Sequence, residues 1–368
     1  MYVSKADRAL ARLDMTSEIL PDPDLFVTMY VRREAVLSSQ IEGTQASLLD
    51  VLEYEARAVD PSKKQDVGEV INYINAMRYG LARLAKLPVS LRLIKEIHAR
   101  LLEKGRGHEK SPGEFRRSQN WIGAPNCSLS EALFVPPPPH EMEKALGELE
   151  RFIHDKTPMP VLIKLGLVHA QFETIHPFLD GNGRMGRLLI TFLLCENEIL
   201  RQPLLYLSYF FKKRRAEYYD RLQAVRDGGD WEGWLRFFLD GVYEVSREAT
   251  EVARRIMRLR EEHRGLMTER MGRGAARGLK LLEALFRSPF VSVAGIAEAT
   301  GLSAANANAL AARCVDLGIL EETTGQKRNR AFVYSSYLSL FEDEFEAETS
   351  IPETAPTVRT VKRKKRRR

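Results

Sequence analysis

Residues 176–187 read His-Pro-Phe-Leu-Asp-Gly-Asn-Gly-Arg-Met-Gly-Arg, and this stretch holds an imidazole, a carboxylate, an amide, three glycines and two guanidinium groups. The segment before it, residues 161–175, carries apolar residues at helical spacing. The run after it, Leu188–Cys195, is strongly apolar and contains no helix breaker. The polar stretch is therefore predicted to form a turn between two buried helices, at the N-terminus of the second helix.

The N-terminus of a helix has a physical use that suits these residue types. Its first backbone N–H groups are free and the positive end of the helix dipole lies there, so it binds anions. Gly181 and Gly183 let the backbone approach a ligand without a Cβ in the way. Arg184 and Arg187 can each hold phosphate oxygens in a fork. The pattern predicts a phosphate-binding site.

Two further side chains of the stretch indicate chemistry at that phosphate. Asp180 offers the hard oxygens that Mg²⁺ prefers. His176 is the residue type whose charge changes near neutral pH, so it is suited to take a proton from a hydroxyl group. A lone histidine or a lone Gly-x-Gly is more often structural, but here eight specified residues in a twelve-residue window fit one task. We interpret the stretch as a nucleotide-phosphate site with a built-in base.

The stretch matches in full the pattern His-x-Phe-x-Asp/Glu-Gly-Asn-Gly-Arg-x-x-Arg, and on it the chain resembles the Fic family, roughly from Leu25 to Tyr243. The resemblance implies a mainly α fold: a Fic helical core with a small β-hairpin flap. It also implies transfer of AMP from ATP, with Mg²⁺ held through Asp180, to a Ser, Thr or Tyr hydroxyl of a target protein. In that reaction His176 is the base. The implied ATP contacts are Gly181, Asn182, Gly183, Arg184, Met185, Gly186, Arg187 and, beside the adenine, Tyr219 or Tyr218.

An upstream pair of residues resembles an inhibitory motif of the same family. Residues 25–52 are predicted to be helical with a break near Gly43. Ser38 and Glu42 are spaced i, i+4 and share one face of this predicted helix. A glutamate on such a face is usually a solvated surface residue, but the family pattern Ser/Thr-x-x-x-Glu-Gly/Asn is inhibitory. The resemblance implies that Glu42 pairs with Arg187, removes one γ-phosphate partner and leaves bound nucleotide in a non-productive pose.

Two short extended segments, near Trp121–Ile122 and Leu133–Val135, flank a loop and predict a β-hairpin. A plain surface hairpin is the simpler interpretation. By resemblance the element over Trp121–Val135 is the flap, which holds a target chain beside the site by strand-like pairing. The run Arg-Ser-Gln-Asn-Trp-Ile-Gly and the prolines after the hairpin also look like the family.

Two other histidines are predicted to be structural. His98 lies on the apolar side of a helical pattern over residues 91–102, where a packed core histidine is more common than a ligand. His169 precedes His176 by seven residues and is expected to hold its helix near the site through a hydrogen bond. Phe178 is expected to point into the core and anchor the loop.

The chain is predicted to have five parts. They are an N-terminal helical region with the inhibitory motif (1–90), the Fic catalytic core (91–245), a connecting helix (246–275), a winged helix-like domain (276–341) and a disordered charged tail (342–368). In the winged helix-turn-helix, the third helix offers Asn306, Asn308 and Arg313, and the wing offers Lys327, Arg328 and Arg330. DNA contact through this domain and the basic tail is one expectation, and a protein-binding or homodimer module is the other.

The composition of the chain limits the class of protein and the cellular compartment to which it can belong. The net charge of +6 comes from residues 359–368, which hold eight Lys or Arg; without them the chain has 48 basic and 50 acidic residues. No apolar run is long enough to cross a membrane, and residues 1–14 do not resemble a signal peptide. Three widely spaced cysteines fit a reducing environment. We expect a cytoplasmic protein.

Two alternatives to AMP transfer stay open. A kinase-like branch of the family carries Lys where this chain has Gly183, so Gly183 favours AMP transfer, but transfer of another nucleotide or removal of AMP is also possible. In a second class of function, the chain is a nucleotide-sensing regulator that binds DNA through its winged helix.

Overall fold

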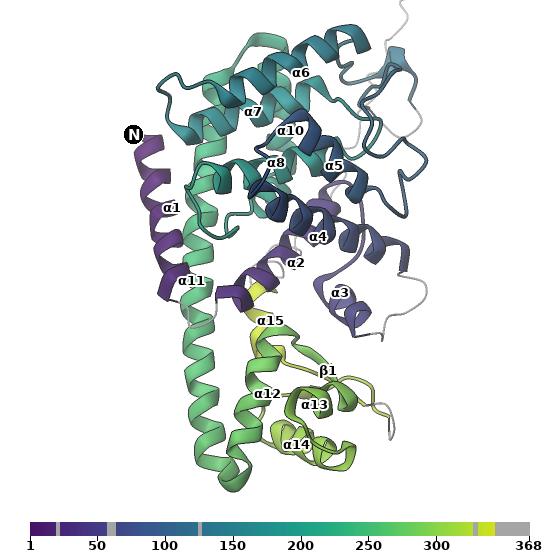
Figure 1. Ribbon diagram of the computed structural model, residues 1–368. Coiled ribbons are helices and arrows are strands. Elements are labelled where there is room, and N and C mark those ends of the chain that lie inside the picture. The colour runs from purple at the N-terminus through teal and green to yellow at the C-terminus, as the bar shows by residue number, and fades with distance from the viewer. Residues whose placement is uncertain (20–22, 57–63, 124–126, 327–329, 343–368) are drawn as a thin grey trace, which may run out of the picture.

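The computed structural model describes residues 1–19, 23–56, 64–123, 127–326 and 330–342, and the protein is mainly helical (Figure 1). The predicted tail from residue 343 onward lies outside the described residues. The elements are α1 (Tyr2–Ile19), α2 (Pro23–Ile41), α3 (Leu48–Glu55), α4 (Lys64–Leu84), α5 (Leu91–Leu101), the 3₁₀ helix η2 (Leu129–Glu131), α6 (Pro139–His154), α7 (Val161–Ile175), α8 (Asn182–Glu196), α9 (Ser208–Lys213), α10 (Arg215–Gly228), α11 (Trp231–Met271), η3 (Gly272–Gly274), α12 (Ala275–Arg287), β1 (Phe290–Ser292), α13 (Val293–Thr300), α14 (Ala304–Asp316), β2 (Glu321–Glu322), β3 (Ala331–Val333) and α15 (Ser335–Glu342).

Helix α8 is the central helix of the larger, helical part of the molecule. Helices α2, α4, α5 and α7 pack around it, so its apolar run is buried on nearly every face. Each fully buried Leu or Phe stabilises the fold by about 1.5–3 kcal/mol relative to an exposed one. Gly80 of α4 allows α4 to pack closely on α8, because a Cβ at this position would lie 2.4 Å from the ring of Phe192.

The turn before α8 has the predicted form. Helix α7 ends at Ile175, and His176 follows it in the left-handed conformation with φ of 49°. Gly181, with φ of 78°, precedes the first residue of α8. A left-handed residue other than glycine is uncommon and often marks a functional site, and here it is the predicted base.

The N-terminal region supplies the helices that cover the motif. The predicted helical stretch with a break near Gly43 is confirmed: α2 ends at Ile41, Gly43 has φ of 98°, and α3 begins at Leu48. Helix α2 packs against α4, α8 and α9, while α1 lies along α11 (Figure 1). The end of α2 is thereby brought to the start of α8.

The C-terminal part has the predicted three helices, α12, α13 and α14, and Ser303 caps α14 by accepting the N–H of Asn306 over 3.4 Å. The strands form an antiparallel sheet in the order β1-β3-β2. Strand β1 and helix α15 were not predicted, because segments of three and eight residues carry little periodic signal. The winged-helix assignment itself stays a prediction.

The C-terminal part contacts the rest of the chain. Helix α12 packs on α2, α15 packs on α11, and the Tyr30 and Phe341 rings lie 5.6 Å apart. Helix α11 is continuous from Trp231 to Met271, so the predicted boundary at residue 245 falls inside one helix (Figure 1). Within the described part of the chain, none of the helices combines the length and apolar character needed to span a bilayer.

Candidate active site

The loop between α7 and α8 is held in shape by its own asparagine. The Oδ1 atom of Asn182 accepts the N–H of Phe178 over 2.8 Å, and its Nδ2 atom donates to the carbonyl of Phe178 over 2.8 Å. The Phe178 ring is fully buried, as expected for an anchor. Both ends of the Asn182 amide therefore shape the loop in this state, and its contact with a phosphate stays a prediction.

His98 supports the loop from α5. Its Nδ1 atom accepts the N–H of Gly113 over 2.9 Å, so Nε2 carries the proton and donates to the carbonyl of Asp180 over 2.9 Å. The imidazole stacks on the Phe178 ring with centroids 3.6 Å apart. The prediction of a packed structural histidine is confirmed, and the structure adds that it fixes the backbone at Asp180.

Two residues before the flap fasten the start of the motif. The buried Arg116 donates to the carbonyl of His176 over 3.0 Å and also to that of Pro137. Asn120 donates to the carbonyl of Phe178 over 2.8 Å. These residues were not predicted as site residues, although Asn120 lies in the family-like run before the flap.

The surroundings of His176 favour the neutral form of its imidazole. It is half-buried, and its Nδ1–H lies 3.4 Å from the carbonyl of Glu173, which leaves Nε2 as the atom that can accept a proton. Burial lowers the pKa of His176 to about 4, and the nearby charge of Arg226 acts in the same direction. At neutral pH the ring is therefore unprotonated and can act as a base.

Arg226 of α10 links this base to the flap. It donates to the same Glu173 carbonyl over 3.0 Å, and its guanidinium lies 3.9 Å from the centre of the Phe134 ring. Glu173 itself is buried against Gly186, and burial raises the pKa of its carboxyl to about 7. The backbone that orients His176 is thus tied to the element predicted to hold the target.

Arg187 is fully engaged by the end of α2. Its Nε atom donates to Ser38 Oγ over 2.8 Å, while Nη2 donates to the carbonyl of Ser38 over 2.9 Å and to Glu42 Oε1 over 2.8 Å. Burial alone would lower the pKa of Arg187, but the Glu42 charge raises it above its usual value. The resemblance implied that Glu42 pairs with Arg187, and the structure has these two residues in contact, while the contacts of Arg187 with Ser38 were not predicted.

The Glu42 carboxylate lies directly over the first turn of α8. Burial alone would raise its pKa, but the charge and hydrogen bond of Arg187 lower it below the usual value. A Cβ at Gly183 would lie 2.3 Å from Glu42 Oε1, so a larger residue would displace the carboxylate from this position. The glycine predicted for close approach and the glutamate predicted at the site therefore contact each other.

Arg184 has a different environment. Its side chain is 1% exposed, yet within the described residues none of its guanidinium nitrogens makes a hydrogen bond. Two carboxylates balance its charge: Nη1 lies 3.7 Å from Glu69 Oε2, and Nη2 lies 3.5 Å from Asp180 Oδ1. A buried guanidinium with open donors beside a helix N-terminus can bind an anion.

The remaining predicted nucleotide contacts lie on α8 and α10. Met185 is fully buried in the core, and the carbonyl of Gly186 accepts a hydrogen bond from His169 Nδ1 over 3.1 Å. His169 Nε2 accepts the Tyr218 hydroxyl over 2.9 Å, which confirms the structural prediction for this histidine. Tyr219 is 39% exposed, so part of its side chain is accessible, and its contact with an adenine stays a prediction.

The flap is less regular than a hairpin. Among its described residues the strand pairing is one antiparallel bridge, between Ile122 and Phe134, followed along the loop by η2. Its apolar side chains Trp121, Leu133 and Val135 are exposed. Residues 124–126 of the predicted loop lie outside the described residues.

Asp180 is the candidate magnesium ligand. Among the described residues, no three His, Cys, Asp or Glu side chains gather into a metal-binding group. Mg²⁺ needs no such group where it is bound through one or two carboxylates together with substrate phosphates. Asp180 is part exposed and lies beside the first turn of α8, so a cation that also binds nucleotide phosphates fits it.

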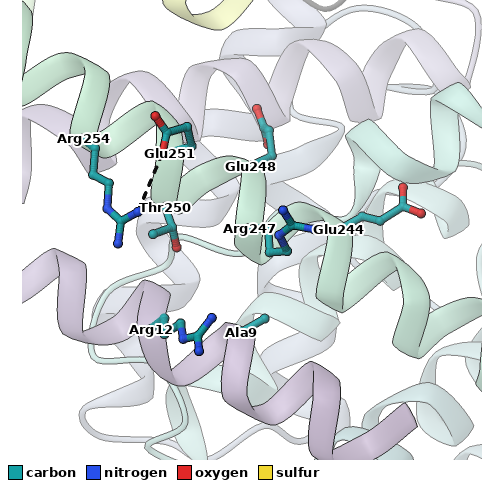
Figure 2. Close-up of a pocket in the computed structure, with 8 residues that line it drawn as sticks. All are labelled: Ala9, Arg12, Glu244, Arg247, Glu248, Thr250, Glu251 and Arg254. Carbon is teal, nitrogen blue, oxygen red and sulfur yellow. Dashed lines mark ion pairs between the residues drawn. The ribbon is translucent and has the colours of Figure 1, made fainter.

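A cavity of about 500 Å³ lies elsewhere, between α1 and α11 (Figure 2). Arginines and glutamates alternate on its walls, and none of the predicted site residues lines it.

In the C-terminal part, two of the described candidate DNA-contact residues, Arg313 and Arg330, have internal partners. Arg313 donates to the carbonyl of Arg270, and Arg330 pairs with Glu322 over 2.9 Å. Lys327 and Arg328 lie outside the described residues, and DNA contact stays a prediction.

The fold and the site together define a helical protein with an anion-binding helix N-terminus, an adjoining neutral imidazole and a carboxylate seated on one of two arginines. Models of the Fic/DOC family match the chain, the N-terminal model over residues 1–82 and the family's main model over residues 88–194. The chain therefore belongs to the Fic/DOC family.

Relatives agree with this assignment. Proteins named protein adenylyltransferase Fic are 32% identical over 207 residues in Drosophila melanogaster and 33% identical over 208 residues in Aedes aegypti. Each match covers 54% of this chain and 38% of the relative, so it spans little more than a third of those proteins. The solved structure of a Fic family protein from Desulfovibrio desulfuricans has the same fold, with a TM-score of 0.59 and 19% identity, over 90% of this chain and 94% of that one.

Proposed function

We propose that the protein is a Mg²⁺-dependent protein adenylyltransferase that Glu42 holds in an inhibited state. The observation that carries the proposal is the first turn of α8, where a neutral imidazole, two arginines and two glycines converge and Glu42 contacts Arg187 over 2.8 Å. The relatives named as adenylyltransferases support the same chemistry.

The proposed binding mode uses the residues predicted from the sequence. The triphosphate lies over Gly181 to Arg187, where α8 has free N–H groups, and Tyr219 lines the adenine pocket. Arg184, whose donors are open, holds the β-phosphate side. Asp180 would hold Mg²⁺, which when bound neutralises charge on phosphate oxygens.

The proposed reaction is one in-line transfer. Nε2 of His176 takes the proton of a Ser, Thr or Tyr hydroxyl, and the hydroxyl oxygen attacks the α-phosphorus. A new P–O bond to the target forms as the bond to the β-phosphate oxygen breaks, and pyrophosphate leaves. The N–H groups of the α8 turn stabilise charge on the α-phosphate, so catalysis rests on positioning and electrostatics.

Glu42 restrains this reaction by occupying Arg187. With Glu42 in place, the guanidinium is not available to the γ-phosphate and the carboxylate repels the triphosphate. The nucleotide then binds in a pose in which the α-phosphorus is not presented to the target hydroxyl.

The test is labelling of the purified full chain with ATP labelled at the α-phosphate and, separately, at the γ-phosphate, with Mg²⁺. We expect Glu42→Gly to take up the α-label and not the γ-label, and Glu42→Gly with His176→Ala to take up neither. Label in the double variant would show that His176 is not the base, and γ-label would indicate phosphate transfer. A separate incubation of labelled Glu42→Gly protein with unlabelled wild type tests AMP removal. If wild type removes AMP, the label should be lost.

A further inference from the structure

Glu69 of α4 is a buried carboxylate that the proposed reaction does not use. It is 3% exposed, and its Oε2 atom faces three partners. Thr44 Oγ1 donates to it over 3.2 Å, Arg106 Nη2 lies 3.4 Å away and Arg184 Nη1 lies 3.7 Å away. A buried carboxylate costs free energy unless partners of this kind compensate it, so these contacts hold Glu69 and its partners together.

Two of these partners belong to the inhibitory segment or bind it. Thr44 follows Glu42 by two residues, just after the left-handed Gly43 that ends the inhibitory helix. Arg106 also donates to the carbonyl of Glu42 over 3.3 Å. Glu69 is therefore fastened to the backbone that carries the Glu42 carboxylate, directly through Thr44 and indirectly through Arg106.

The third partner is one of the two arginines of the motif. Arg184 is 1% exposed and makes no hydrogen bond within the described residues, so its charge is balanced by Glu69 and Asp180 alone at ion-pair distances. A phosphate that bound Arg184 would bring negative charge next to Glu69. The buried carboxylate and the nucleotide therefore compete for the same cation.

We propose that Glu69 is a second inhibitory carboxylate, which fastens the turn that carries Glu42 and keeps Arg184 charge-compensated until nucleotide phosphates replace it. The proposal rests on the proposed function of the α8 site. In the inhibited state each motif arginine then faces a carboxylate from the N-terminal region: Arg187 faces Glu42, and Arg184 faces Glu69.

The experiment compares full-length wild type, Glu69→Gln, Glu42→Gly and the double variant in the α-label assay. Loss of one buried charged partner weakens such a contact by about 1–2 kcal/mol, so Glu69→Gln alone should raise labelling about tenfold. In the double variant, labelling should match that of Glu42→Gly within about twofold, because the restraint is already gone. Unchanged labelling in Glu69→Gln, or a loss in the double variant, would overturn the proposal in favour of a role in arranging Arg184 for catalysis.

The matched control is Asp66→Asn. Asp66 lies on the same helix and accepts the N–H of Gln45 over 2.8 Å, yet within the described residues it pairs with no arginine. Its substitution should leave labelling within about twofold of wild type. An increase equal to that of Glu69→Gln would show that any loosening of this turn suffices and would overturn the part of the proposal that involves Arg184.

Hydrogen exchange separates this proposal from the function it rests on. Glu69→Gln should speed amide exchange in residues 39–46 about tenfold, whether or not any variant labels, and Glu69→Asp should restore part of the protection. If Glu42→Gly takes up no label, the proposed function fails while exchange still tests the fastening. If residues 39–46 exchange as slowly in Glu69→Gln as in wild type, Glu69 does not fasten the turn.

Discussion

The two arginines in the first turns of α8, Arg187 and Arg184, are both buried, but their charges are compensated in different ways. Both guanidinium groups are almost fully buried, at 3% and 1% exposure of the residue. Arg187 donates three hydrogen bonds of 2.8–2.9 Å to Ser38 and Glu42. Arg184 donates none within the described residues and is balanced only by carboxylates 3.5 and 3.7 Å away.

The difference indicates how a nucleotide meets the site. On the Arg184 side a phosphate gains hydrogen bonds to donors that are already open. On the Arg187 side it must first break directed contacts with Glu42 and Ser38. In the proposed function, the Arg184 side exchanges its carboxylate contacts at 3.5 and 3.7 Å for a phosphate, whereas the Arg187 side stays closed until Glu42 moves.

The largest expected effect is removal of the contact that closes the Arg187 side. Breaking a buried ion pair changes the free energy by about 3 kcal/mol or more, so Glu42→Gly should raise the rate of α-label uptake about a hundredfold. Glu42→Gln, which keeps an acceptor without the charge, should lie between wild type and Glu42→Gly. Equal rates for all three proteins would contradict the inhibitory role.

The two arginines should also differ in what they contribute to stability. Arg187→Gln loses three charge-assisted hydrogen bonds and should lower the free energy of unfolding by about 3 kcal/mol. Arg184→Gln loses no hydrogen bond, and Glu69 keeps Thr44 and Arg106 as partners, so the loss should be smaller, about 1–2 kcal/mol. Urea denaturation followed by tryptophan fluorescence measures both, and equal losses would show that the two environments are equivalent.

Nucleotide affinity offers a third comparison. With Arg187 occupied, wild type should bind ADP and ATP about equally, because the third phosphate finds no partner. In Glu42→Gly the freed guanidinium should favour ATP over ADP about tenfold, the gain expected from one charge-assisted contact. Calorimetric titration with Mg²⁺ measures both ligands, and an ATP preference in wild type would mean that Glu42 does not exclude the third phosphate.

Ser38→Ala removes one neutral partner of Arg187 and should have a smaller effect. Loss of the hydrogen bond to Ser38 Oγ, worth about 1 kcal/mol, should raise labelling about fivefold. Ser39→Ala is the matched control, because the neighbouring Ser39 hydroxyl is also buried but has no hydrogen-bond partner among the described residues. A similar rise in both variants would point to general loosening of α2.

The smallest expected effect is on the base itself. The Glu42 charge favours the protonated form of His176 and so raises its pKa, against the lowering by burial and Arg226. In Glu42→Gly the pKa of His176 should therefore fall further, by less than about one unit. An NMR titration of the imidazole measures this pKa, with the signals of the exposed His140 as reference, and a rise would contradict the position of Glu42 near the ring.

The local parts of the site were predictable because their signals lie within one stretch. The helix over residues 161–175, the turn at His176 and the buried helix after it follow from periodicity, glycine placement and the apolar run. The break at Gly43 is also local, since it depends on one left-handed residue. In each case one window of sequence contains both the cause and the result.

The supporting contacts were not predictable in the same way. Glu69 and Arg184 are separated by more than a hundred residues, and Glu69, as an isolated residue on an amphipathic helix, looks like a surface charge. Arg116 and Arg226 bind backbone carbonyls, which any sequence offers everywhere. The Glu42–Arg187 pair was found only through family resemblance, because spacing along the chain says nothing about which helices meet.

Helix α11 sets the spacing between the larger helical part and the C-terminal part. Its 41 residues, at about 1.5 Å of rise each, make a rod of about 60 Å that is shared by the catalytic helices and the C-terminal part. Helix α12 folds back along α11 and packs onto α2, so the two parts are packed against each other as well as joined by α11. A molecule bound to the C-terminal part would therefore lie at a set distance and angle from the flap, and in the proposed function that spacing would limit which targets can reach both.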